Sequence, residues 1–489
     1  MLKKELIISV VASLVVLAGC NNGSSTCDDT HDVVDGQELD NTVKALIKTH
    51  GISGDPSKGI TVPSLESPKA QLGMKLFYTK ALGGDKDSAC VTCHHPALGG
   101  GDRLSLPIGV AALDPDLLGE GRLYDPSAIH YDKGYALVGR NAPSTYNVAL
   151  WKNGVFWDGR VAHVLDDNNV SGIRTPDTPL GTIDPNAGTS LASAQARFPV
   201  TAGNEMRGFV FEEGNSTQAV RQHLVERLTN SNASDYIPNT WEAEFAPVYG
   251  ENNITFNNIV DAIGTYENTQ VFVNNPWKNY VEGNVTAISE SAKRGAKLFY
   301  SSYSEGGLNC VSCHSGDFFT DEEYHVMAMV QVGHGKTSKH EDFGRFHNTG
   351  TDKYAFRTPT LLNVEVTGPW GHDGAYTELK DVVAHMVNPE KAIATYDKTK
   401  LNANVLTDDM EKNTQGALNQ LHANREFGIS KHQSVDINDT ELDDLVAFLK
   451  TLTDPCLKDR SCIGKWIPQE SDGVDGLQLN ARDKDGNLI

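Results

Sequence analysis

The stretch Ala-Cys-Val-Thr-Cys-His-His-Pro, residues 89–96, holds two cysteines three positions apart, followed directly by two histidines. A second stretch, Asn-Cys-Val-Ser-Cys-His-Ser at 309–315, repeats the pattern 220 positions later. The spacing Cys-x-x-Cys-His has three interpretations: a zinc site, a dithiol redox centre, or covalent attachment of a c-type haem. The surrounding sequence is needed to choose among them.

The repeat extends beyond the two cysteine motifs. Residues 73–78, before the first motif, match residues 295–300, before the second. Two further pairs of matching segments follow in the same order, 140–148 with 357–364 and 156–160 with 370–374. Three matched landmarks in one order predict two related domains. We place the divisions of the chain at a signal peptide (1–19), an N-terminal extension (20–64), a first domain (65–285), a second domain (286–455) and a C-terminal tail (456–489).

The composition is that of a soluble globular protein. The 489 residues, with 39% hydrophobic and 22% charged, are enough for two or three domains with their own cores. The formal net charge of −22 argues against binding nucleic acid or anionic lipid, because like charges repel. It favours instead a small partner with a basic face.

The N-terminus is predicted to be a targeting segment. Lys3 and Lys4 precede an apolar run at 6–18 that is too short to span a bilayer. The run ends in Leu17-Ala18-Gly19-Cys20, which resembles the lipobox of bacterial lipoproteins. In that family the peptide is cut before the cysteine, so Cys20 would be acylated and would anchor the periplasmic protein to the cell envelope. The alternative is an ordinary secretory signal with a chance cysteine.

Export also bears on the other cysteines, because unpaired thiols tend to oxidise outside the cytoplasm. Residues 21–36, rich in Asn, Ser, Asp and Gly, are interpreted as a flexible tether. Cys27 lies in this tether and is given no partner. Cys456 and Cys462 frame a short loop near the C-terminus, and we expect them to pair.

The predicted fold class is mainly α: two cytochrome c-like haem domains related by the internal repeat, with long loops. Ser67 before Pro68 is typical of a helix start, and it predicts a helix through Tyr78. Ser289 opens the matching helix, and apolar periodicity predicts further helices at 218–229 and 439–452. Strand patterns are sparse, while 45 glycines and 20 prolines fit loops that wrap a cofactor.

Haem attachment is the interpretation that the motifs favour. A zinc site needs four ligands, so the two motifs would have to merge across two domains. A dithiol oxidoreductase is expected near a βαβ unit, and the sequence shows no such unit. In a c-type site the two thiols form thioethers and the next histidine reaches the iron. The predicted ligands are Cys90, Cys93 and His94 for the first haem, and Cys310, Cys313 and His314 for the second. His95 is expected to face solvent or make a local hydrogen bond.

With these motifs in place, the sequence resembles the bacterial di-haem cytochrome c peroxidase and MauG family over roughly residues 65–455. The resemblance rests on matching segments along the chain, at 90–100, 140–143, 156–160, 205–206, 310–314, 356–360 and 367–374.

The resemblance implies roles around the first haem. Trp157 is similar to the tryptophan that relays electrons between the haems, and Glu205 to the distal carboxylate that moves protons during O–O cleavage. Gln195 and Pro199 match the family's Gln and Pro over the same haem. Plainer alternatives are core packing for Trp157 and a surface position for Glu205.

For the second haem, the resemblance implies that Met386 is the axial ligand of the iron. Methionine is the choice of the peroxidases and tyrosine that of MauG, and a thioether ligand raises the reduction potential. His385 is a weaker candidate, and core packing is the alternative for Met386. The resemblance also implies an interdomain calcium ion held by Asn141, Thr367 and Pro369, largely through carbonyl oxygens. A plain turn is the alternative for Asn141.

The sequence departs from the family pattern in several places. Many members carry a displaceable distal histidine where this chain has Val110, which cannot bind iron, although His130 in the long loop that follows could substitute. Residues 162–193 are an insertion that we interpret as a surface loop. The tail from 463 to 489 is polar and is expected to cover a surface.

The function that the resemblance implies is reduction of hydrogen peroxide to water. Electrons would come from a small periplasmic c-type cytochrome or a cupredoxin, enter at the second haem and pass through Trp157 to the first. The alternatives are MauG-like oxidation of residues in a partner protein, and a non-enzymatic electron carrier. The sequence leaves the oligomeric state open, a homodimer included.

Overall fold

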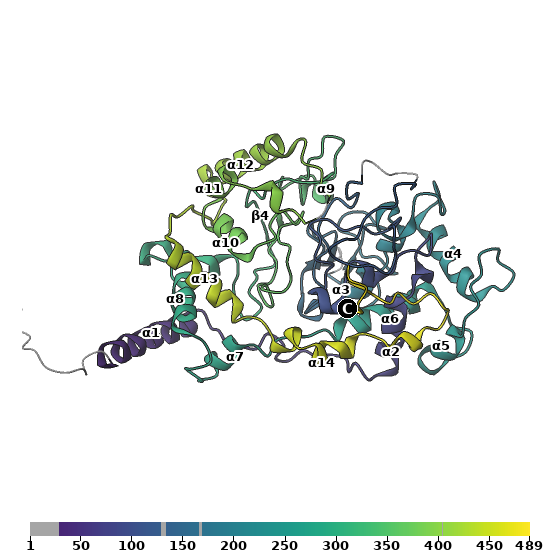
Figure 1. Cartoon of the computed structure of the whole chain (residues 1–489), viewed down its shortest axis with the longest axis horizontal. Helices are drawn as coiled ribbons and strands as arrows, with labels where there is room; N and C mark the ends of the chain where they lie inside the picture. Colours follow the sequence, from purple (N-terminus) through teal and green to yellow (C-terminus); the bar gives the residue numbers. More distant parts are fainter. Residues whose placement is uncertain (1–28, 129–133, 166–168, 403) are drawn as a thin grey trace, which may run out of the picture.

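The computed structural model describes residues 29–128, 134–165, 169–402 and 404–489, which are mainly helical with a few short strands and long loops (Figure 1). The mainly α class that the sequence predicted is confirmed, while the domain divisions stay predictions. Within the described residues, no helix is both long enough and apolar enough to cross a membrane.

The α-helices of the described residues are α1 (Asp29–Thr49), α2 (Pro68–Tyr78), α3 (Leu191–Gln195), α4 (Thr217–Thr229), α5 (Trp241–Tyr249), α6 (Phe256–Asn268), α7 (Pro276–Val281), α8 (Glu290–Tyr300), α9 (Phe346–Thr349), α10 (Leu379–Val387), α11 (Pro389–Ala394), α12 (Met410–Glu426), α13 (Asp439–Lys450) and α14 (Arg460–Ile463). Two small antiparallel sheets hold the strands, β1 (Gly154–Val155), β2 (Val161–Leu165) and β3 (Ser171–Arg174) in one and β4 (Tyr324–His325) and β5 (Phe356–Arg357) in the other.

Two close helix crossings organise the molecule, one in the first half of the chain (residues 65–285) and one in the second half (residues 286–489). In the first half α2 crosses α6 at Gly73, where an added Cβ would lie 1.9 Å from the carbonyl oxygen of Ala262. In the second half α8 crosses α13 at Gly295, where an added Cβ would lie 2.0 Å from the carbonyl oxygen of Asp444. Only glycine permits either approach. Ser67 and Ser289 cap α2 and α8 in the same way, each accepting the amide three residues on, as the sequence predicted.

Each half also lends a segment to the other. The loop that follows the first motif contributes Leu106, Ile108 and Tyr124 to the hydrophobic core of the second half. The C-terminal tail contributes Leu479 and Ala481 to the core of the first half. These exchanges interlock the halves.

The tail follows α13, includes α14, and continues past α2 (Figure 1). It pairs with the chain after α2, where the Leu479 amide donates to Tyr78 O at 2.8 Å. The buried carboxylate of Asp475 accepts from the Thr79 hydroxyl at 2.7 Å and from the Trp241 indole at 3.0 Å. The expectation that the tail covers a surface is met, with several of its side chains buried.

Two predicted loops contain regular structure. The flexible tether predicted for 21–36 is wrong from Asp29 onward, because α1 begins there and packs on α8 through the buried Val43 and an Asp40–Lys293 ion pair at 3.0 Å. The insertion at 162–193 is not loop alone: β2 and β3 form a hairpin that buries Ile173. The Cys456–Cys462 disulfide is confirmed. Cys20, Cys27 and His130 lie outside the described residues.

Candidate functional site

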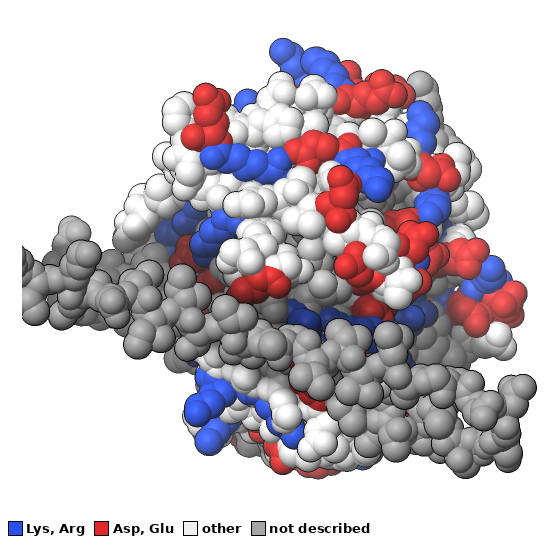
Figure 2. Space-filling view, turned by 90° about the vertical axis from the view of Figure 1, so that its left-hand side faces the viewer, with Lys and Arg blue, Asp and Glu red and all other residues white. Residues whose placement is uncertain are grey.

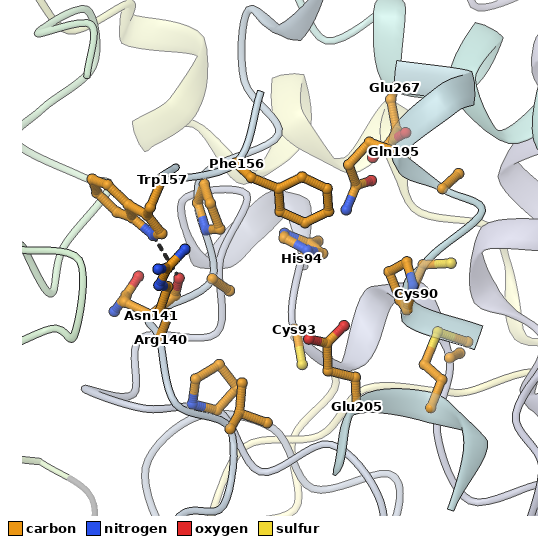
Figure 3. Close-up of a pocket in the computed structure, with 18 of the residues that line it drawn as sticks. Cys90, Cys93, His94, Arg140, Asn141, Phe156, Trp157, Gln195, Glu205 and Glu267 are labelled. Carbon is orange, nitrogen blue, oxygen red and sulfur yellow. Dashed lines mark hydrogen bonds between the residues drawn. The ribbon is translucent and has the colours of Figure 1, made fainter. Parts of the chain in front are cut away.

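The first half contains a cavity into which most of the predicted site residues point (Figure 3). Cys90, Cys93 and His94 come from the turn after α2, and Gln195 ends α3. Glu205 sits on a single π-helical turn, Gly203–Arg207, a local distortion that proteins often use at functional sites. Further lining residues are Asn141, Trp157, Pro199, Glu267 of α6 and, from the second half, Lys336.

Both motif histidines present a ring nitrogen suited to iron. His94 Nδ1 donates to the carbonyl of Gly100 at 3.2 Å, and His314 Nδ1 donates to the carbonyl of Phe319 at 3.0 Å. Because only an N–H can donate to a carbonyl, each Nε2 keeps its lone pair for a metal. Burial lowers the pKa of both rings, which favours the neutral form that binds iron. The residues present therefore fit a haem at each motif.

The two competing interpretations of the motifs fit less well. Burial raises the pKa of the Cys90, Cys93 and Cys310 thiols, to about 12 for Cys310, so the reactive thiolate of a redox dithiol is disfavoured. The four motif cysteines form no disulfide with one another. Among the described residues, the one cluster of three or more metal-binding side chains is Cys313, Asp321 and His325. It does not join the two motifs, so the merged zinc site lacks support.

Val110 does not line this cavity. It is fully buried, and the preceding Gly109 backs the Glu205 turn so closely that an added Cβ would lie 2.2 Å from the Glu205 carbonyl oxygen. Within the described residues, His94 is the only histidine of the cavity lining. His95, by contrast, is buried outside it, and its Nδ1 accepts a local hydrogen bond from the Ala97 amide at 3.1 Å. Of the two fates expected for His95, the local bond is the one observed.

Trp157 is held by both halves of the chain. Its indole N–H donates to the carbonyl of Asn141 at 2.9 Å, a bond visible in Figure 3. Its own carbonyl accepts the amide of Arg357, from β5 of the second half, at 2.9 Å. The side chain is partly buried and lines the first cavity. It therefore lies at the wall between the first cavity and the second half.

Asp158, which follows Trp157 in the sequence, belongs to a buried network of ion pairs that joins the two halves. Arg140 bonds Asp158 of the first half at 2.7 Å and Asp342 of the second half at 2.6 Å. Burial disfavours the charge on Asp158, but Arg160 and Arg140 outweigh that effect and lower its pKa to about 2. The sequence analysis noted Arg140 only as part of a motif. Asp342 was missed, because a pairing across 202 residues leaves no local pattern.

Comparison with known proteins agrees with this geometry. The family model described as di-haem cytochrome c peroxidase matches residues 67–286. The MauG protein of Methylophilus methylotrophus is 25% identical over 390 residues, covering 80% of this chain and 84% of its own. The cytochrome c551 peroxidase of Pseudomonas aeruginosa is 27% identical over 328 residues, covering 67% of this chain and 73% of its own. Residues 67–286 thus match a di-haem cytochrome c peroxidase domain, and the chain as a whole is similar to proteins named MauG and cytochrome c551 peroxidase.

Solved structures show the same fold. A MauG-like protein associated with microbial copper homeostasis has a TM-score of 0.52 and 21% identity, covering 86% of this chain and 97% of its own. A variant of the diheme peroxidase BthA from Burkholderia thailandensis has a TM-score of 0.50 and 21% identity, covering 86% of this chain and 92% of its own. At this identity the likeness speaks for the fold alone.

In the second half, Met386 lies on α10 and is partly buried. Its carbonyl accepts from His432 Nε2 at 2.8 Å, while the neighbouring Lys431 ammonium donates to Ser312 O, inside the second motif, at 3.1 Å. This segment therefore links the backbone of Met386 to that motif. His385 is fully buried, with one ring nitrogen bonded to Tyr376 at 2.7 Å and the other to Met327 O at 2.9 Å. Since both nitrogens are engaged, the geometry favours Met386 over His385 as a ligand.

The proposed calcium ligands are less clearly arranged. The carbonyl of Asn141 already accepts the Trp157 indole, and the side-chain amide donates to Leu104 O and Ser105 O at 3.1 Å each. A metal bond from Asn141 would therefore fall to its side-chain oxygen. Thr367 borders the first half, with its Cα 3.2 Å from a Cβ built on Gly99, and Pro369 is buried two residues later. Calcium binding stays a prediction.

Proposed function

We propose that this protein reduces hydrogen peroxide to water at the first haem, using electrons that enter at the second. The observation that carries the proposal is that Glu205 and Gln195 share one cavity with His94, Cys90 and Cys93. A carboxylate and an amide over a haem are the groups that peroxide chemistry requires, and a pure electron carrier has no need of either.

The haem, when bound, would supply the iron that takes peroxide and stores redox equivalents. Glu205 is suited to accept a proton from one peroxide oxygen and return it to the other, which is general acid–base catalysis. Gln195 can orient the peroxide through its amide. Trp157, bonded to both halves, is the proposed electron relay between the two centres.

The electron donor is proposed to be a small basic electron carrier, a c-type cytochrome or a cupredoxin. On the face seen in Figure 2, acidic and basic side chains are interspersed rather than gathered by sign. Attraction would then come from the overall charge of −22 rather than from one patch. We also propose that the protein is exported and anchored to the envelope through Cys20, so Cys20→Ala should release it into the soluble fraction.

MauG-like oxidation of a partner protein is the second candidate. It is favoured by Val110, which leaves no histidine to close the first iron, and disfavoured by Met386, which stands where MauG carries tyrosine. If the first centre is open, oxidised protein should react at once with one equivalent of peroxide. His130→Ala tests whether that residue closes it instead: silence in the wild type with reaction in the variant would reject the open centre.

The deciding experiment measures peroxide consumption by the holoprotein with a reduced small cytochrome. Glu205→Gln should slow turnover by about 100-fold or more, since general acid–base catalysis contributes that much. Glu213→Gln is the matched control, because Glu213 is exposed and lies outside the cavity lining. Unchanged turnover in the Glu205 variant, or no peroxide consumption by the wild type, would reject the proposal.

A further inference from the structure

Glu267 is a buried carboxyl group that the proposed catalytic steps do not use. It lies on α6, is 6% exposed and lines the first cavity, on the same side as Gln195 in Figure 3. Its Oε2 has no hydrogen-bond partner among the described residues. The titratable groups that sense it electrostatically are the Cys90 thiol and the Tyr266 phenol, and neither is a cation.

The second half shows what packing alone requires at this position. At the first crossing Gly73 faces Ala262 O and Tyr266 Cβ, and at the second crossing Gly295 faces Asp444 O and Phe448 Cβ. The two crossings therefore align Tyr266 with Phe448, and the next residue, Glu267, with Leu449. Leu449 is 5% exposed and belongs to the hydrophobic core. An apolar side chain satisfies this position in the second half, so the carboxyl group is particular to the pocket that would handle peroxide.

An ionised carboxylate without a partner is very costly to bury, so the resting group is the neutral acid. Burial raises the pKa of Glu267 to about 8, which agrees with this state at neutral pH and lets the group titrate close to it. A neutral acid on a cavity wall can give up a proton.

We propose that Glu267 is a proton store of the first pocket, which supplies a proton during turnover and regains it from solvent. The inference rests on the proposed function. Reducing one peroxide to two waters takes two electrons and two protons. Glu205 moves a proton between the two oxygens and adds none to that total. The donor protein supplies the two electrons, and the O–O bond breaks. Of the two protons that complete the second water, one comes from the Glu267 O–H and the other from solvent.

The test uses the holoprotein and two readouts, the infrared carbonyl band of a protonated carboxylic acid and the pH profile of peroxide turnover. In the wild type the band should fade as pH rises through about 8, in line with the pKa of Glu267. Burial also raises the pKa of Asp373 to about 8 and that of Asp102 to about 7, so the Glu267 band is identified in the difference between the wild-type and variant spectra. Glu267→Gln should remove that component of the band and slow turnover by about 100-fold or more, the range of a lost general acid. Glu267→Leu, which introduces the residue found at the aligned position 449, should give the same two results. It controls for a folding defect caused by glutamine itself. Glu205→Gln should keep the titrating band.

The outcomes separate this inference from the proposed function. If the difference between the wild-type and Glu267→Gln spectra shows no titrating carboxyl band, or if that variant keeps wild-type turnover and pH profile while Glu205→Gln is inactive, Glu267 has a structural role only and the inference is overturned. If no variant and no wild type consumes peroxide, the proposed function fails. A titrating Glu267 band would then still show that Glu267 exchanges a proton, but the use of that proton in peroxide turnover would be rejected.

Discussion

At the two helix crossings the backbone is arranged alike, yet the side chains beside them differ in chemistry. In the first half the cavity wall carries two carboxyl groups, Glu205 and Glu267, and an amide, Gln195. In the second half the corresponding α13 presents Leu449, and the proposed ligand Met386 packs against the hydrophobic core. The same scaffold thus offers protons in one half and an apolar setting in the other, which suits peroxide chemistry and electron storage respectively.

The contacts that join the two halves beside the first cavity are polar. Arg140 links Asp158 to Asp342, and Trp157 bonds the backbone on one side and accepts a backbone amide on the other. Removing one partner of a buried ion pair strongly destabilises a protein, so this network favours one relative placement of the halves. This placement is what an electron relay between fixed centres needs.

The largest effect is expected from removing the cysteines of one motif at a time. Cys90→Ser with Cys93→Ser should lower the haem content from two to one per chain and abolish peroxide turnover. Cys310→Ser with Cys313→Ser should also leave one haem, with the first centre still able to bind peroxide. Haem stoichiometry by mass spectrometry and optical titration provides the check. Two haems remaining in either variant would show that the altered motif is not an attachment site.

The next largest effect separates Met386 from its neighbour. Met386→Ala should convert the second haem from low to high spin and slow electron uptake, because a soft thioether ligand raises the reduction potential. His385→Ala is the matched control, since both of its ring nitrogens already bond Tyr376 and Met327. Electron paramagnetic resonance distinguishes the two spin states. The spin change appearing in the His385 variant instead would exchange the two roles.

Each of the two helix crossings can be disrupted by one substitution of the same kind. Gly73→Ala and Gly295→Ala each place a Cβ within about 2 Å of a backbone carbonyl, which cannot move aside as a side chain can. Forcing the helices apart should cost about 3 kcal/mol in each case, at the upper end of overpacking. Gly101→Ala is the control, because its Cβ would meet nothing closer than 3.7 Å. Denaturant unfolding measures the loss, and a variant as stable as wild type would mean that the crossing there is loose.

The sequence predicted the helices and the disulfide that leave a local pattern of residues. Cap residues and apolar periodicity marked α2, α8, α4 and α13, and the spacing of Cys456 and Cys462 indicated their disulfide. α1 was missed because a polar, glycine-containing segment has little helix signal of its own and is stabilised by packing on α8. The 162–193 hairpin was missed because its strands are four or five residues long and are separated by turn residues.

The site was predictable as far as motifs reach. The resemblance named Glu205, Gln195 and Trp157, and the structure brings them into one cavity, although their roles stay proposals. Lys336 lines the first cavity from the second half, and Asp342 bonds Arg140 of the cavity lining; no local sequence pattern connects either residue to the site. Glu267 did leave a signal: it is the charged residue on the otherwise apolar face of α6 formed by Ile259, Ile263 and Tyr266.

The last expected effect concerns the stability of the protein as pH changes. The pKa of Glu267 is raised from its ordinary value of 4.5 to about 8 by burial, so the folded protein holds a proton that the unfolded chain has released. Stability should therefore fall as pH rises between these two values, by about 1.4 kcal/mol for each pH unit. Glu267→Leu removes the titrating group, so its stability relative to wild type should improve steadily from about pH 5 to about pH 8 and then level off. Leu449→Val, at the aligned position of the second half, should cost the same at every pH, because it adds no ionisable group. Urea unfolding of the holoprotein at several pH values measures both differences. A Glu267→Leu difference that is as constant as that of Leu449→Val would mean that the carboxyl group finds a partner in solution, and the contrast between the two pockets would then lie in Glu205 and Gln195 alone.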